Sequence, residues 1–418
     1  MEDTRTSIDT GSARFHGIDK DGIRIFRGIT YARYGRFEEA VPVQPEGDID
    51  ATTYGCVCPQ RSNRLASIMG EDKGSVIEEG RLCLSIYSPA GAKDLPVMVW
   101  IHGGAFLTGG SEEQRYSGER LVRTGNVVVV KISYRLGAFG FLHMPDKGIS
   151  NLGLHDQRTA LEWVQEHISA FGGNPDDVTV FGQSAGALSV AALIATSTDR
   201  LLFRKAILQS APLGIGMTPK EADRIAKAFL KRLGKDLKEA TMDELLDAQE
   251  AIKKMKTGLT FMPLLPDFQE IPELVRKSGL KVVVGYTAED ASPFLKGLGF
   301  LFDTAIDRAA IRWATRTTFS ESSEQYLGKL REAGLEATKY FISWHPEGNP
   351  LGACHCIELP FILGEYEDWC ESKMLQGITQ DEYSRNSGDL LRAWTTFARE
   401  GRFPGGGILQ VAISDRDS

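Results

Sequence analysis

The segment that starts at Val178 constrains the fold most strongly. The short apolar run Val178-Thr179-Val180-Phe181 leads into Gly182-Gln183-Ser184-Ala185-Gly186, and a stretch rich in alanine and leucine follows. A β-strand that turns sharply into a helix fits this order, because the flanking glycines let the turn close without side-chain clashes. The G-x-S-x-G pattern in this setting predicts that Ser184 projects from the sheet as a nucleophile. An ordinary glycine-rich turn is the alternative.

Strand and helix signals alternate around this segment. Strands are predicted at residues 23–25, 82–87, 97–101, 127–132, 178–181, 205–208 and 280–284, and a helix at 156–168. The runs at 97–101 and 127–132 are almost wholly apolar, which is typical of strands buried on both faces of a parallel sheet. The alternation predicts an α/β fold with a mostly parallel, doubly wound sheet.

A helical insertion is expected between the last two predicted strands, over residues about 214–275. Two capping boxes, Thr218-Pro219-Lys220-Glu221 and Thr241-Met242-Asp243-Glu244, each place a hydroxyl at the N-cap and a glutamate three residues later. The sequence holds no repeat or low-complexity linker that would divide it. We therefore expect residues 1–418 to form a single catalytic domain with an inserted helical cap.

The charge balance narrows the class of partner. Lysine and arginine number 48 against 56 aspartate and glutamate residues, for a net charge of −8. This balance disfavours general binding to nucleic acid or to anionic lipid. The start of the chain lacks the pattern of a secretory signal, and no apolar run is long enough to cross a bilayer. We expect a cytoplasmic protein that acts on a small molecule.

The cysteines are too sparse for a disulfide scaffold and are expected to be free thiols in a reducing compartment. They are Cys56, Cys58, Cys83, Cys354, Cys356 and Cys370. A metal site built from Cys56 and Cys58 with residues 354–356 is the alternative, and the one-residue spacing disfavours it. We expect no metal and no cofactor.

A second glycine-rich loop, His102-Gly103-Gly104-Ala105-Phe106, follows the predicted strand at 97–101. Attack of a hydroxyl on an ester creates an oxyanion, and each backbone N–H aimed at it contributes roughly 3–4 kcal/mol. We expect the N–H groups of Gly104, Ala105 and Ala185 to form this oxyanion hole, with Gly103 in support. An ordinary turn, with His102 in a structural role, is the alternative.

These motifs together resemble the type-B carboxylesterases, the family that includes bacterial para-nitrobenzyl esterases and the cholinesterases. Residues 171–186 fit the family's serine signature, and residues 26–32, 133–137 and 151–157 resemble three further family blocks. The resemblance implies the α/β-hydrolase fold. It also implies a serine carboxylesterase that hydrolyses small-molecule esters through an acyl-enzyme intermediate.

The resemblance also implies the other catalytic residues. Residues 352–359 match the family's histidine block, which makes His355 the general base and places Glu358 beside it. Residues 285–291 match the block that carries the acid, and Asp290 is expected to orient His355. Because the family more often has glutamate there, Glu289 stays a candidate.

Two further positions bear on the site and its surroundings. Ser210 resembles a family serine that lies beside the catalytic residues, and a buried hydroxyl satisfied by the backbone is an equal alternative. Arg81 stands where secreted members of the family have a cysteine, so its usual partner, Cys58, lacks a bridge. This substitution favours a reducing compartment.

Three functions are compatible with these residues. Hydrolysis of a carboxylic ester is favoured, and the order serine, acid, histidine agrees with α/β-hydrolases. The same residues could cleave a lactone or an amide, or transfer the acyl group to another acceptor. A non-catalytic recognition protein that resembles cholinesterases is disfavoured, because such proteins have usually lost catalytic residues that this sequence keeps.

Overall fold

The computed structural model describes residues 4–61, 65–70, 74–253, 259–265, 267–296 and 304–412. A large mixed sheet runs through the described residues in the order β1-β2-β3-β8-β10-β9-β11-β12-β13-β14-β15, with β4 beside β3 and β5 beside β2. The strands are β1 Thr4–Asp9, β2 Ala13–Lys20, β3 Ile23–Tyr34, β4 Ala40–Pro42, β5 Gly47–Asp50, β8 Arg81–Pro89, β9 Leu95–Ile101, β10 Val128–Ile132, β11 Gly173–Gln183, β12 Lys205–Gln209, β13 Lys281–Thr287, β14 Glu336–Ile342 and β15 Leu409–Ala412. A separate short pair joins β6 (Cys56–Val57) and β7 (Val76–Ile77).

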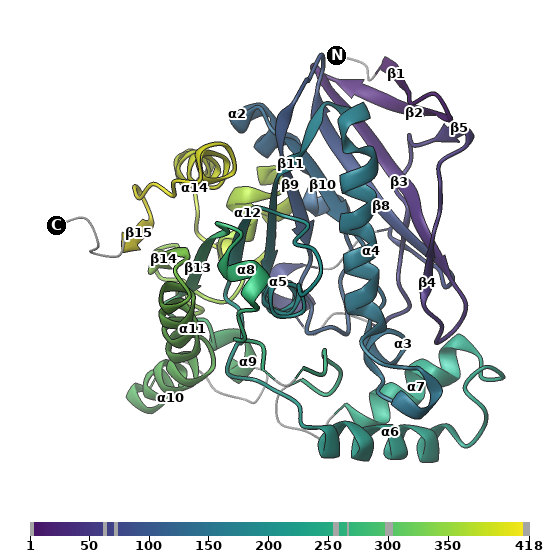
Figure 1. Ribbon diagram of the computed structural model, residues 1–418. Coiled ribbons are helices and arrows are strands. Elements are labelled where there is room, and N and C mark those ends of the chain that lie inside the picture. Colours follow the sequence, from purple (N-terminus) through teal and green to yellow (C-terminus); the bar gives the residue numbers. More distant parts are fainter. Residues whose placement is uncertain are drawn as a thin grey trace.

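The centre of the sheet is parallel, and its edges are antiparallel except for β5, which pairs in parallel with β2. Strands β10, β9, β11, β12, β13 and β14 pair in parallel, while β1, β2, β3 and β8 form an antiparallel meander and β15 closes the far edge. Short turns join the first three strands, and short turns can only link antiparallel neighbours. Each predicted strand coincides with an observed strand, with starts that agree to within one residue or fall inside it. The parallel centre confirms the expected α/β fold, and the antiparallel strands at the edges add to it (Figure 1).

Helices cover both faces of the parallel centre, which is the expected doubly wound arrangement. On one face α4 (Leu152–His167), α5 (Ala185–Ala195) and α11 (Glu321–Glu332) pack in one hydrophobic core. On the other face α2 (Glu119–Gly125), α12 (Leu359–Ile362) and α14 (Gln380–Glu400) pack in a second. The helix predicted at 156–168 is α4, which begins four residues earlier.

Two helices between β12 and β13 form the segment expected as a cap. They are α6 (Pro219–Leu233) and α7 (Met242–Ile252), and both predicted capping boxes are present at their starts. The side chain of Gln249 on α7 accepts a hydrogen bond from the backbone N–H of Ala138 at 2.8 Å. That residue lies in α3 (Gly137–Phe141), so α7 is fastened to the body of the protein. Both helices lie at the lower end of the view in Figure 1.

The other described helices are short, apart from α10. They are α1 Ala66–Met69, α8 Glu273–Arg276, α9 Ser292–Lys296, α10 Ala305–Thr315 and α13 Tyr366–Trp369, with 3₁₀ turns at Gln114–Tyr116, Pro145–Lys147, Ile168–Phe171 and Lys373–Leu375 and a π-helical turn at Arg316–Ser320. Among the described residues no helix has the length and apolarity that crossing a bilayer requires.

A buried ion pair joins the loop after β10 to α4. Arg135 and Asp156 have fully buried side chains, with Arg135 Nη2 at 2.6 Å from Asp156 Oδ1 and Nε at 2.8 Å from Oδ2. The backbone N–H of Arg135 donates to the same carboxylate at 3.0 Å. Both oxygens of Asp156 are therefore occupied by one residue.

We expect Asp156→Ala to lower the free energy of unfolding by about 3–5 kcal/mol, because it leaves the Arg135 guanidinium buried without its counter-charge. Denaturant unfolding measures the loss. The matched control is Asp223→Ala, which removes the exposed pair with Lys227 on α6 and should cost less than about 0.5 kcal/mol. Equal losses in the two variants would contradict the argument.

Candidate active site

The turn after β11 holds Ser184 in a conformation that few residues other than glycine adopt. Ser184 has φ 58° and ψ −120°, and α5 begins at the next residue. A Cβ on Gly182 would lie 2.6 Å from the carbonyl group of Gly186, and one on Gly186 would collide with the carbonyl oxygen of Ile101. Only glycine fits at both positions, so the G-x-S-x-G pattern is required by packing as well as by the turn.

The loop after β9 lies directly against this turn. A Cβ on Gly103 would be 3.3 Å from the Cβ of Ser184. Gly104 and Ala105 have φ 107° and 58°, and among the described residues none accepts a hydrogen bond from the N–H of either. Ala185 is the first residue of α5, where backbone N–H groups have no partner within the helix. The three expected donors thus belong to two segments that meet at Ser184.

His102 supports the loop from within. Its ring is buried, stacks on Tyr134 with centroids 4.4 Å apart, and has Nδ1 2.8 Å from the carbonyl oxygen of Gly103. Tyr134 also donates its hydroxyl to the carbonyl of His102 at 2.8 Å. Burial lowers the pKa of His102 to about 4, so the ring is neutral at ordinary pH and serves a structural purpose.

His355 and Asp290 form a buried pair. Asp290 follows β13, His355 follows β14, and His355 Nδ1 lies 2.6 Å from Asp290 Oδ1 with both side chains inaccessible to solvent. The other carboxylate oxygen, Oδ2, accepts from Ser210 Oγ at 2.8 Å and from the N–H of Thr287 at 2.9 Å. The hydroxyl of Ser210 thus contacts Asp290 directly.

Glu289 contacts the histidine loop in a different way. Its Oε2 accepts from the N–H of Ala353 at 2.8 Å, and its own N–H donates to the carbonyl of Ala353 at 3.0 Å. Asp290, not Glu289, therefore faces the imidazole.

The nitrogen of His355 on the side away from Asp290 contacts Gln183. Gln183 Nε2 lies 3.1 Å from His355 Nε2, which makes the amide the donor and the imidazole nitrogen the acceptor when Nδ1 carries the proton. Among the described residues no hydrogen bond links Ser184 Oγ to His355. The chain neighbour of Ser184 thus holds His355 at the turn, and sequence reasoning missed this residue because G-x-S-x-G leaves its position free.

Two aromatic rings flank the imidazole. Phe294 on α9 and Phe319 in the π-helical turn have ring centroids 5.1 and 5.2 Å from that of His355. The extra residue of a π-helical turn changes the direction of the side chains that follow it. No local sequence pattern predicts that these two rings lie together, because they are 25 residues apart in the chain.

Glu358 is a second buried carboxyl beside the pair. Its Oε1 accepts from Gln209 Nε2 at 3.2 Å, and its Oε2 has no partner among the described residues. Burial, and then the negative charge of Asp290, raise the pKa of Glu358 to about 7. The group therefore changes charge near neutral pH.

This raised pKa predicts a pH-dependent stability. The folded protein keeps the Glu358 proton up to about pH 7, whereas the unfolded chain releases it near the ordinary value of 4.5. The free energy of unfolding therefore falls as the pH rises through this window. We expect Glu358→Gln to remove this loss. The difference in the free energy of unfolding between the variant and the wild type should therefore shift by about 3 kcal/mol in favour of the variant from pH 4.5 to pH 8. Denaturant unfolding at both pH values tests it, and a pH-independent difference would contradict it.

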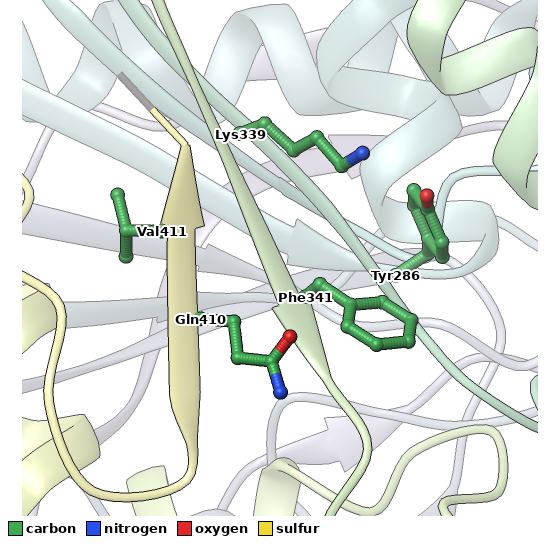
Figure 2. Close-up of a pocket in the computed structure, with 5 residues that line it drawn as sticks. All are labelled: Tyr286, Lys339, Phe341, Gln410 and Val411. Atoms are coloured by element: carbon green, nitrogen blue, oxygen red, sulfur yellow. The ribbon is translucent and has the colours of Figure 1, made fainter.

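Nothing in the described residues forms a metal centre. No group of three or more histidine, cysteine, aspartate or glutamate side chains there could hold an ion. A separate cavity of about 440 Å³ opens at the sheet edge, lined by Tyr286, Lys339, Phe341, Gln410 and Val411 (Figure 2). No predicted site residue lines it.

Comparisons with known proteins agree over most of the chain. A family model described as the carboxylesterase family matches residues 4–335, which include Ser184 and Asp290 and end before His355. A probable N-octanoylanthranilate hydrolase from Rhodococcus erythropolis is 33% identical over 410 residues, covering 91% of this chain and 90% of that protein. The para-nitrobenzyl esterase of Bacillus subtilis (strain 168) is 33% identical over 450 residues, covering 95% and 90%.

A solved structure gives the same result for the fold. A thermophilic PNB esterase superposes with a TM-score of 0.83 at 32% identity, covering 96% of this chain and 94% of that one. The similarity therefore extends past the histidine loop to nearly the whole chain.

Proposed function

The chain belongs to the carboxylesterase family, and from this premise we propose that Ser184, His355 and Asp290 carry out the ester hydrolysis. The protein is a serine carboxyl-ester hydrolase of the α/β-hydrolase fold, as the family match and its para-nitrobenzyl esterase relatives establish. Its substrates are small-molecule esters. The proposal concerns which residues act and how.

Ser184 Oγ attacks the ester carbonyl while His355 Nε2 takes its proton. For this step His355 must accept from Ser184 in place of Gln183, whose amide now lies 3.1 Å from Nε2. Catalytic hydrogen bonds are often misaligned without substrate and tighten when it binds. His355 then returns the proton to the leaving alcohol, and a water molecule releases the acyl group by the same steps in reverse.

Asp290 holds the imidazole in the tautomer that this proton transfer requires. With both carboxylate oxygens bound, it can take up only one orientation towards His355 Nδ1. It also stabilises the imidazolium that forms after attack. The N–H groups of Gly104, Ala105 and Ala185 stabilise the oxyanion, with Gly103 allowing the close approach to Ser184.

One observation carries this proposal: the buried 2.6 Å contact between His355 and Asp290, beside the strained turn that bears Ser184. A fluorophosphonate probe tests it. We expect one equivalent of probe to react with the wild type and abolish hydrolysis of p-nitrophenyl acetate. Full activity after stoichiometric labelling, or no labelling of an active protein, would contradict the proposal.

A second candidate is cleavage of an N-acyl bond, which the probable N-octanoylanthranilate hydrolase among the relatives favours. The same residues serve an ester, an amide, a lactone or transfer to another acceptor. Product analysis separates them. With p-nitrophenyl octanoate and added methanol, we expect the free acid as the main product. Methyl octanoate as the main product would instead establish acyl transfer, and faster cleavage of the corresponding octanoyl anilide than of the ester would establish an amidase.

We also propose that the chain is a single domain with residues about 214–275 as a cap, which the contact between Gln249 and Ala138 supports. The net charge of −8 supports a protein that binds neither nucleic acid nor anionic membrane. Buried free thiols and Arg81 at the position of a family cysteine support a cytoplasmic location.

A further inference from the structure

Two buried cysteines lie close together where β6 packs against β8. Cys56 on β6 and Cys83 on β8 have Sγ atoms 3.6 Å apart and side chains that are 1% and 0% exposed. The distance is that of a thiol hydrogen bond. A disulfide needs the sulfur atoms at about 2.05 Å, so closure requires a movement of about 1.5 Å.

The backbone around the pair is already closely packed. A Cβ on Gly55 would lie 2.9 Å from the Cβ of Cys83, so the chain entering β6 can approach β8 only because residue 55 is glycine. Neither cysteine has the position implied by the family resemblance for a bridge, since that bridge would join residues 58 and 81. The pair is displaced by two residues at each end, and Arg81 lies beside it.

The surroundings of the two thiols affect their pKa values in opposite directions. The hydrogen bond from Cys83, and more weakly the nearby charge of Arg81, lower the pKa of Cys56. The same hydrogen bond and burial raise the pKa of Cys83. Because a lower pKa favours the thiolate, we assign Cys56 as the sulfur that reacts first with a small oxidant and Cys83 as the sulfur that follows.

We propose that Cys56 and Cys83 are a redox modification site that closes to a reversible disulfide in the presence of hydrogen peroxide. The Cys56 thiolate attacks one peroxide oxygen, the O–O bond breaks, and hydroxide leaves to give a sulfenic acid. The sulfur of Cys83 then attacks the sulfenic sulfur, the S–O bond breaks, and water leaves with the Cys83 proton. Two thiols and one peroxide thus give one disulfide and two waters.

The other cysteines serve as internal comparisons. Burial raises the pKa of the thiols of Cys58, Cys354 and Cys356, and among the described residues none of the three forms a hydrogen bond with another sulfur. Cys370 is exposed, and its Sγ contacts only the carbonyl of Glu367 among the described groups. It can therefore react with peroxide but has no neighbour with which to form an intramolecular bridge.

Closure would fasten a segment that contacts Gly109, which lies against His102 and Gly103 of the glycine-rich loop. Gln60, which lies within the closed loop, donates to the carbonyl of Gly109 at 2.9 Å and accepts from its N–H at 2.8 Å. Fixing the ends of a 28-residue loop restricts the unfolded chain, and for a protein of this size the expected rise in Tm is about 4 °C.

Peptide mapping after oxidation tests the inference. The full-length protein is reduced, freed of reductant, treated with hydrogen peroxide, alkylated and digested. We expect a Cys56–Cys83 linked peptide, loss of both of these thiols to alkylation, and recovery of both with dithiothreitol. Cys83→Ser should abolish the linked peptide and the rise in Tm, and Cys370→Ser should retain both.

The wild-type map decides the matter even if a serine variant folds poorly. Three results would each overturn the proposal. They are alkylation of both Cys56 and Cys83 under conditions that oxidise Cys370, a bridge to a different cysteine, and sulfinic acid at Cys56 without a bridge. Esterase activity is not the readout, so failure here is distinguishable from failure of the catalytic assignment.

Discussion

Replacing Ser184 with alanine is expected to lower kcat for p-nitrophenyl acetate by roughly 10⁴- to 10⁶-fold, while the protein stays folded. Removing the nucleophile leaves only the binding and oxyanion contributions, which is the loss seen when a serine triad is disabled. Steady-state assays with purified protein measure it. The turn should keep its conformation, because alanine has the same Cβ as serine and the structure records no hydrogen bond of the Ser184 side chain among the described residues.

A buried serine on α5, the helix that follows the turn, provides the control. Ser189 on α5 accepts from Gln157 Nε2 at 3.0 Å and is fully buried. Ser189→Ala should reduce stability by about 1 kcal/mol and leave kcat within a few-fold of the wild type. If Ser184→Ala keeps more than a few per cent of the activity, or if Ser189→Ala loses as much, Ser184 is not the nucleophile.

The second large effect is expected at the acid. Asp290→Asn should lower kcat by about 10⁴-fold, because an amide opposite Nδ1 favours the wrong tautomer of His355 and removes the charge that stabilises the imidazolium. The bonds from Ser210 and Thr287 keep the side chain in place, so the loss should fall on kcat more than on KM. The pH profile of the residual activity reports whether His355 still acts as the base.

Glu289→Gln is the matched control for this prediction. This variant leaves Asp290 unchanged. The amide oxygen of the new side chain can still accept a hydrogen bond from the N–H of Ala353, as the carboxylate of Glu289 does at 2.8 Å. We expect kcat within about threefold of the wild type, since the lost charge faces the backbone of the loop rather than the imidazole. A larger loss in Glu289→Gln than in Asp290→Asn would reverse the assignment of the acid.

Local sequence patterns predicted the parts of the site that depend on local geometry. The strand, turn and helix around Ser184 follow from the glycines at 182 and 186, and both capping boxes follow from side chains three residues apart. The antiparallel edges of the sheet were harder to predict, because the sequence of a buried strand does not specify its direction. The antiparallel direction of β8 against β10 depends on tertiary pairing.

Contacts between distant segments could not be predicted in the same way. Gln183 and His355 are 172 positions apart, and the serine motif accepts any residue at 183. The choice between Glu289 and Asp290 stayed open because adjacent side chains differ only in direction, which the fold of the loop decides. Cys56 and Cys83 were expected to be free thiols, and their approach to 3.6 Å arises from the packing of β6 on β8.

The most direct test of the catalytic account is to map a fluorophosphonate adduct in the wild type and in His355→Gln. The account predicts a single adduct on Ser184 in the wild type, and a labelling rate at least about 10³-fold lower in the variant, because the base that activates the hydroxyl is gone. Circular dichroism verifies that the variant is folded. An adduct on another residue, or equal labelling rates in the two proteins, would contradict the account.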